Sequence, residues 1–135
     1  MIIKVILSFL AAAAFFIVPI VLTVAIETPI IVRGGVTDSK TYIRNVNIVT
    51  NVLLNLVLAG LLLWLRQVSD QDRVIKIAFV WFILAELILI PVSEAQLYRK
   101  ISAVGTKRIF LFTYLANAVS CAAGLVLSWL IRVLL

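Results

Sequence analysis

Long apolar stretches alternate with short polar ones along the whole chain. Basic residues are missing from four windows, residues 5–32, 45–65, 77–98 and 109–131. Each window is at least as long as the roughly 20 apolar residues that a helix needs to cross the hydrocarbon layer of a bilayer. Runs such as LLNLVLAGLLLWL lack the apolar–polar alternation of a transmembrane β-strand. The pattern therefore predicts four transmembrane helices, at residues 5–32, 44–66, 74–98 and 107–132, in a single transmembrane domain over residues 1–135.

The composition agrees with this pattern. Hydrophobic residues make up 64% of the chain and charged residues 13%, whereas a soluble domain has about 25% charged residues. The first window, with Lys4 and a run of alanines, also resembles a signal peptide. Its apolar part continues past the alanines as FFIVPIVLTVAI, beyond the usual 7–15 residues of a cleavable segment. We therefore expect an all-α polytopic membrane protein, a compact bundle of four helices with no separate soluble domain.

Charge and rare residues exclude several functions. The net charge is +6, but the basic residues flank the apolar spans, so they suit lipid headgroups rather than nucleic acid. The chain has no histidine, which removes His-ligated haem, the usual zinc sites and His-based catalytic triads. Cys121 is the only cysteine, so no internal disulfide forms, and we expect it to pack as a small apolar residue. No cofactor is expected.

Loop charges predict an orientation. We call the face with the two ends of the chain and the 66–76 connection side A, and the face with the 33–44 and 99–108 connections side B. Side B carries seven basic and one acidic residue, and side A five basic and two acidic. Because cytoplasmic loops are enriched in Lys and Arg, we expect side B to be cytoplasmic and both termini to lie outside, in a prokaryotic cytoplasmic membrane.

The fourth window carries small residues at four-residue spacing: Ala116, Ser120, Gly124 and Ser128. Such a ridge lets two helix backbones approach closely. Ser8 and Ala12 offer a matching surface in the side A half of the first helix, so we expect these two helices to pack there. A homodimer contact through the same ridge is the alternative.

Polar residues within the spans converge on one level. At 1.5 Å per residue, Glu27, Asn51, Glu94 and Asn117 lie roughly 8–13 Å from side B, one on each helix. Helical spacing puts further polar residues on the same faces: Asn47 and Asn55 with Asn51, and Glu86 and Tyr98 with Glu94. We expect these eight residues to line a small cavity that opens toward side B.

The carboxyl groups give this layer its chemistry. No basic residue lies within the spans, so Glu27, Glu86 and Glu94 must be neutral, solvated or bound to a cation. Pro29 and Pro91 free backbone carbonyls close to them. Oxygen and amide groups suit a proton, a hard cation such as Na⁺, Mg²⁺ or Ca²⁺, or a polar cationic solute. The identity of any metal stays open.

Four short motifs resemble those of an uncharacterised family of small four-helix prokaryotic membrane proteins. They are E-x-P at Glu27–Pro29, T-N-x-x-x-N at Thr50–Asn55, E-x-x-x-Y at Glu94–Tyr98 and A-N-x-x-S at Ala116–Ser120. Val52 departs from the pattern, which has proline after the T-N pair. The resemblance implies a four-helix topology and importance for Glu27, Asn51, Asn55, Glu94, Tyr98 and Asn117, but no activity.

Two functions remain from the sequence. The first is a transporter-like or channel-like protein, or a subunit of one, that binds a proton or cation at the polar layer. Four helices enclose too little volume for a pore, so transport would require a homodimer or a larger membrane complex. The second is a non-catalytic structural or assembly subunit whose polar layer is interhelical hydrogen-bonding glue. An intramembrane paired-carboxylate enzyme is a third alternative, and we expect no enzyme.

Overall fold

The computed structural model describes residues 2–68 and 70–134, with side chains described for 17–67, 70, 72–130 and 133, and its regular secondary structure over these residues is all helical. Its elements are α1 (Ile2–Arg33), α2 (Lys40–Val68), α3 (Gln71–Leu84), the π-helix η1 (Ala85–Leu89), α4 (Ile90–Tyr98) and α5 (Thr106–Leu134). Three stretches of the described chain are long and apolar enough to cross a membrane: Lys40–Gln67, Asp72–Tyr98 and Thr106–Leu130. They support an integral membrane protein.

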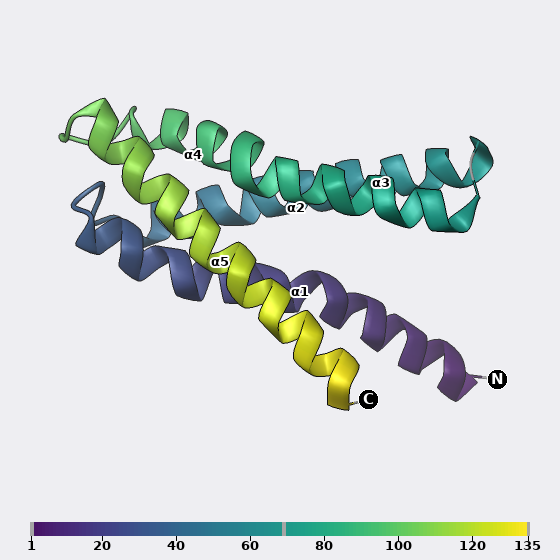
Figure 1. Ribbon diagram of the computed structural model, residues 1–135. Coiled ribbons are helices and arrows are strands. Elements are labelled where there is room, and N and C mark those ends of the chain that lie inside the picture. Colours follow the sequence, from purple (N-terminus) through teal and green to yellow (C-terminus); the bar gives the residue numbers. More distant parts are fainter. Residues whose placement is uncertain (1, 69, 135) are drawn as a thin grey trace.

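The helices lie closer together at side B and diverge toward side A (Figure 1). Both connecting loops, 34–39 and 99–105, lie at the left of this view, and the two ends of the chain and the α2–α3 turn lie at the right. α5 packs against α1, η1 and α4, whereas α2 packs against α1, α3 and α4. The helices therefore pack most closely in the half of the molecule that contains the expected polar layer.

The third predicted helix, 74–98, is observed as three successive elements, α3, η1 and α4. The Ile90 amide donates to the Ala85 carbonyl five residues back, which widens the turn. Pro91 has no amide proton. The Glu86 carbonyl therefore receives neither of its usual backbone hydrogen bonds, because one donor is diverted and the other is missing. Single π-turns of this kind occur often at functional sites.

The turn after α1 follows from two adjacent glycines. Gly35 has a φ of 64°, and the amides of Gly35 and Val36 donate to the carbonyls of Val32 and Ile31, at 2.9 and 3.2 Å. This is a Schellman motif, which ends a helix with a left-handed residue. The Gly34 carbonyl accepts from Arg108 Nε at 2.7 Å. The turn is thus tied directly to the first part of α5.

The main core lies at the side B end. It gathers buried side chains from four helices and from the turn after α1: Ile31, Val36, Ile43, Val46, Ala95, Tyr98, Ile109 and Ala116. A smaller core of Leu54, Ala85 and Ile90 joins α2 to the η1 region, deeper in the spans. The polar layer lies between these two apolar groups along α2 and α4.

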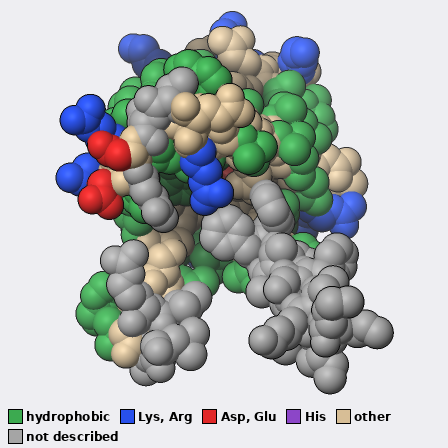
Figure 2. Space-filling model, turned by 90° about the vertical axis from the view of Figure 1, so that its right-hand side faces the viewer, with side chains coloured by type: hydrophobic (Ala, Val, Ile, Leu, Met, Phe, Trp, Pro, Cys, Tyr) green, Lys and Arg blue, Asp and Glu red, His purple; other side chains and the backbone are tan. Residues whose placement is uncertain are grey.

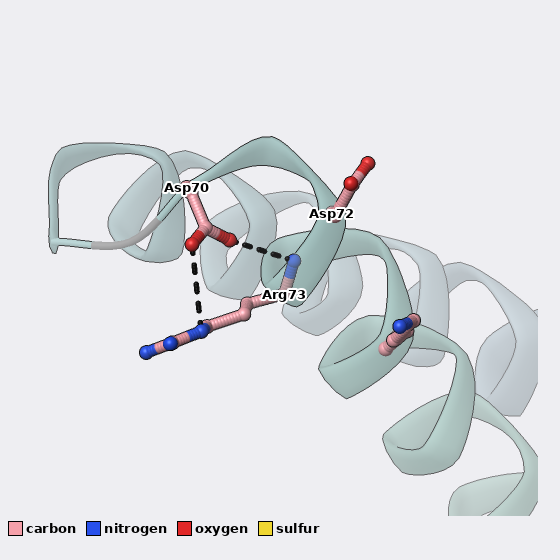
Figure 3. A pocket seen from close by; sticks show the side chains of 4 residues that line it. Asp70, Asp72 and Arg73 are labelled. Atoms are coloured by element: carbon pink, nitrogen blue, oxygen red, sulfur yellow. Dashed lines mark hydrogen bonds and ion pairs between the residues drawn. The ribbon is translucent and has the colours of Figure 1, made fainter.

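The start of α3 is fixed by a charged cap at side A (Figure 3). Asp70 Oδ1 accepts from the Arg73 amide at 3.0 Å, and Asp70 Oδ2 lies 3.4 Å from Arg73 Nε. These groups, with Asp72 and Lys76, line an open hollow of about 510 Å³. Both side chains of the ion pair are more than half exposed, at 78% and 63%. The hollow is therefore a solvated helix end of mixed charge, and such exposed pairs add little stability.

Figure 2 looks at the molecule from this side A end. Lys, Arg, Asp and Glu side chains lie around the upper part of the surface, over an underlying hydrophobic body. Large apolar side chains such as Leu63, Trp64, Trp81 and Trp129 are more than half exposed. A surface this apolar suits contact with lipid.

Candidate functional site

Glu94 is the centre of a buried polar cluster at the expected level. Its side chain is fully buried, on α4. Its Oε1 accepts from Thr50 Oγ1 of α2 at 2.8 Å, and its Oε2 accepts from Asn117 Nδ2 of α5 at 2.7 Å. One carboxyl group therefore joins three separate helices.

Asn47 bridges this carboxyl to a second one. With its amide nitrogen toward the carboxyls, Asn47 donates to Glu27 Oε2 at 2.8 Å and to Glu94 Oε1 at 2.9 Å. This orientation follows from the neighbouring groups, since two carboxylates are acceptors only. Glu27 and Glu94, from α1 and α4, are thus held on either side of one amide group.

Glu27 is completed by α5. Its Oε1 accepts from Ser120 Oγ at 2.7 Å, across 93 residues of sequence. Every carboxyl oxygen of Glu27 and Glu94 therefore has a hydrogen-bond donor from another helix. We call Glu27, Asn47, Thr50, Glu94, Asn117 and Ser120 the carboxyl cluster.

Helical spacing explains how the donors reach the cluster. Asn47 and Thr50 lie three residues apart on one face of α2, and Asn117 and Ser120 lie three apart on one face of α5. Asn117 Nδ2 also donates to the Thr113 carbonyl at 3.0 Å, which fixes its rotamer. The hydroxyls of Thr50 and Ser120 also lie near carbonyls of their own helices, at 3.0–3.2 Å. The donors are therefore held in place by their own backbones.

The cluster is charged only by its carboxyl groups. Within the described residues, the one ion pair is that of Asp70 and Arg73, far from Glu27 and Glu94. Two buried anions without a cation would cost several kcal/mol. No described side chain supplies a compensating positive charge next to the pair.

The described residues do not show the expected opening toward side B. Glu27 and Glu94 are 0% exposed, and four apolar side chains between them and the side B loops are buried to the same extent. Ile31, Ile43, Tyr98 and Ile109 form this apolar layer. The sequence argument missed it because these residues are ordinary apolar positions, whose convergence depends on the packing of four helices.

Tyr98 belongs to this layer and not to the hydrogen-bonded cluster. Its ring lies 6.2 Å from that of Tyr42, centroid to centroid. Its hydroxyl is buried and has no hydrogen-bond partner among the described residues, and the same holds for Thr28 next to Glu27. The hydroxyls of Tyr98 and Thr28 are therefore two buried groups near the cluster that have no hydrogen-bond partner among the described residues.

Three other predicted site residues lie outside the hydrogen-bonded cluster. The Asn51 amide is buried and donates at 2.9 Å to the Asn47 carbonyl of its own helix. Asn55 and Glu86 are partly exposed, and no hydrogen bond joins either side chain to a described residue. Glu86 lies in η1, which packs against α5, so it forms a separate, deeper carboxyl.

The predicted packing ridge is divided. Ala116 and Ser120 are buried, whereas Gly124 is partly exposed and Ser128 is exposed. A Cβ at Gly124 would meet no described atom within 4 Å. The described hydrogen bonds that join α1 and the turn after it to α5 lie toward side B, at Gly34–Arg108 and Glu27–Ser120. The side chains of Ser8 and Ala12, expected opposite the ridge, lie outside the described residues.

Sequence reasoning gave Thr50 and Ser120 no place in the site. Thr50 appeared only as the first residue of the T-N-x-x-x-N motif, and Ser120 as a packing residue. The available signal was that both lie within the short motifs, three residues from Asn47 and Asn117. Among the described residues, no group of three or more His, Cys, Asp or Glu side chains is arranged to hold a metal ion.

No family model matches the chain, and no curated protein or solved structure matches it significantly.

Proposed function

We propose that this chain is a four-span membrane protein whose carboxyl cluster binds a proton or a cation, as a small transporter or a subunit of one. The observation that carries the proposal is the Glu27–Asn47–Glu94 bridge, two buried carboxyls that share one amide and have no basic partner among the described residues. α1 would be the fourth transmembrane helix, because it is 32 residues long and packs against α2 and α5.

The cluster suits a change of protonation without movement of the helices. Thr50 and Ser120 each have one proton and lie within reach of both a carboxyl and a backbone carbonyl. When the carboxyl is ionised, the hydroxyl donates to it. When the carboxyl is protonated, it donates to the hydroxyl, which then donates to the carbonyl.

Asn47 is adaptable in the same way. Its NH₂ group satisfies two carboxylates, and a flipped amide would present its oxygen to two protonated carboxyls. A hydrogen-bond network that only joined helices would need one protonation state. Because the hydrogen bonds of the cluster can be satisfied with ionised and with protonated carboxyls, we favour a site that binds and releases a proton or a cation.

The second candidate is a structural or assembly subunit. It is favoured by the complete hydrogen bonding of Glu27 and Glu94 within the chain. Interhelical hydrogen bonds of this kind contribute about 0.6 kcal/mol each on average.

Thermal unfolding in mild detergent separates the two candidates. Wild type and Glu94→Gln are compared across pH and with Na⁺, Mg²⁺ and Ca²⁺. A ligand at 100 times its dissociation constant stabilises the folded state by about 2.7 kcal/mol. A stabilising ion or pH step that Glu94→Gln no longer detects supports the binding site. Melting temperatures that no cation and no pH change shifts, in wild type or in the variant, support the structural role.

Dimerisation, a larger complex, and the cytoplasmic location of side B remain part of the proposal. The seven basic residues of the side B connections support this orientation. Reactivity of single cysteines introduced into loops 34–39 and 99–105, toward an impermeant reagent added outside cells, tests it.

A further inference from the structure

A groove on the lipid-facing surface leads to the carboxyl cluster. It has a volume of about 280 Å³ and runs between α2 and the α3–η1–α4 rod. The α2 wall has its lining residues at helical spacing, and the opposite wall comes from all three elements of the rod. The lining consists of Thr50, Leu53, Leu54, Val57, Leu58, Leu61, Trp81, Ala85, Leu89, Ile90 and Ser93.

Thr50 connects the groove to the site. It lines the groove, and its hydroxyl lies 2.8 Å from Glu94 Oε1. Ser93, immediately before Glu94 in the chain, lines the same end. The rest of the lining is apolar as far as Trp81 at the side A end, roughly 16 Å away along α2. The groove therefore has one polar end, with a buried carboxyl directly behind it.

The apolar lining of the groove restricts which ligands can reach the cluster through it. The apolar layer of Ile31, Ile43, Tyr98 and Ile109 closes the side B approach. A bare inorganic cation that entered through the groove would lose its hydration shell against apolar side chains, which is costly. A molecule with an apolar body would fill the groove and present its charge only at the polar end.

Resting on the proposed function, we infer that the ligand is an amphiphilic organic cation, with its apolar body in the groove and its ammonium head beside Thr50 and Glu94. Charge complementarity supports this occupant, because an ammonium head would neutralise the buried carboxyl pair. The groove volume is close to the lower end of small-molecule pockets, about 300 Å³, so the body is a single short chain or ring.

The test is equilibrium binding of 4-phenylbutylammonium to the purified protein in mild detergent. The neutral 4-phenylbutanol measures the affinity of the same apolar body without charge. Leu58→Trp fills the groove, and Leu56→Trp, an exposed position on the same helix outside the groove, is its matched control. Helical content by circular dichroism shows that each variant is folded.

We expect saturable binding of the ammonium compound at least tenfold tighter than that of the alcohol. Leu58→Trp and Glu94→Gln should each weaken it at least tenfold, with Leu56→Trp unchanged. Equal binding of the alcohol, or full affinity in folded Leu58→Trp, would overturn the inference. If Na⁺, Mg²⁺, Ca²⁺ or pH still stabilises wild type through Glu94 in that case, the proposed function stands without it. If none does, both fail.

Discussion

Thr50 Oγ1 and Glu94 Oε1 lie 2.8 Å apart, although 44 residues separate them in the sequence. This contact joins α2 to α4, and it also joins the buried carboxyl cluster to the surface groove. The same hydrogen bond therefore holds two helices together and lies at the polar end of the groove. The stability of the bundle and the binding of a ligand should change together when this region is altered.

Replacing Asn47 by leucine removes the amide between Glu27 and Glu94. Two buried carboxyls then lose a shared donor, and we expect the free energy of unfolding to fall by about 1–3 kcal/mol. Asn45→Leu, at an exposed position two residues earlier, should change it by less than about 0.5 kcal/mol. Unfolding from mild detergent, followed by circular dichroism, measures both. Equal stability of the two variants would contradict the bridge.

Replacing Ser120 by alanine leaves Glu27 Oε1 without its donor from α5. The expected loss of stability is about 1 kcal/mol. Ser128→Ala, at an exposed position of the same ridge, should unfold like wild type. If both substitutions have the same effect in the same unfolding assay, the ridge acts as a packing surface and the Ser120–Glu27 bond contributes nothing.

Glycine at position 34 is required by a close approach between α1 and α5. A Cβ there would overlap the Phe112 ring, so Gly34→Ala should destabilise the protein by about 1–3 kcal/mol. The Cβ of Gly60→Ala would meet no described atom within 4 Å. That variant should gain up to about 1 kcal/mol from helix propensity. Melting temperatures of the two alanine variants check the opposite signs.

A comparison of Glu86→Gln with Glu94→Gln tests whether the deeper carboxyl of Glu86 is independent of the carboxyl cluster. Glu86 is partly exposed and has no hydrogen-bond partner among the described residues, so the substitution should leave the unfolding free energy within about 0.5 kcal/mol of wild type. Glu94→Gln replaces an acceptor oxygen by an NH₂ group that faces other donors, and should cost about 1–3 kcal/mol. A larger loss for Glu86→Gln, measured by thermal unfolding, would place the structural centre in η1 instead.

Much of the layout follows from simple patterns. The windows without basic residues predicted the positions of the long helices, because apolar length is a local property of the chain. The level shared by Glu27, Asn51, Glu94 and Asn117 followed from rise per residue, and three of these four residues contact one another through the cluster. Asn51 does not, because its amide finds a backbone partner on its own helix.

Other features depended on tertiary packing. The π-turn at Ala85–Leu89 has only Pro91 as a local signal, and proline alone does not distinguish a π-turn from a kink. The apolar layer on the side B side of the cluster comes from residues of α1, α2, α4 and α5, and in the sequence these positions look no different from exposed apolar ones. The groove beside Thr50 likewise depends on the distance between α2 and η1, which no spacing along the chain determines.

The most direct measurement is infrared difference spectroscopy of the carboxylic acid C=O stretch. Spectra of wild type are compared at low and high pH, and before and after addition of Na⁺, Mg²⁺, Ca²⁺ or 4-phenylbutylammonium. The account predicts a band of a buried protonated carboxyl that disappears when the pH rises or a cation binds, and that is missing in Glu94→Gln. A band that no pH or cation alters, or one that Glu94→Gln retains in full, would contradict the claim that this cluster exchanges protons and cations.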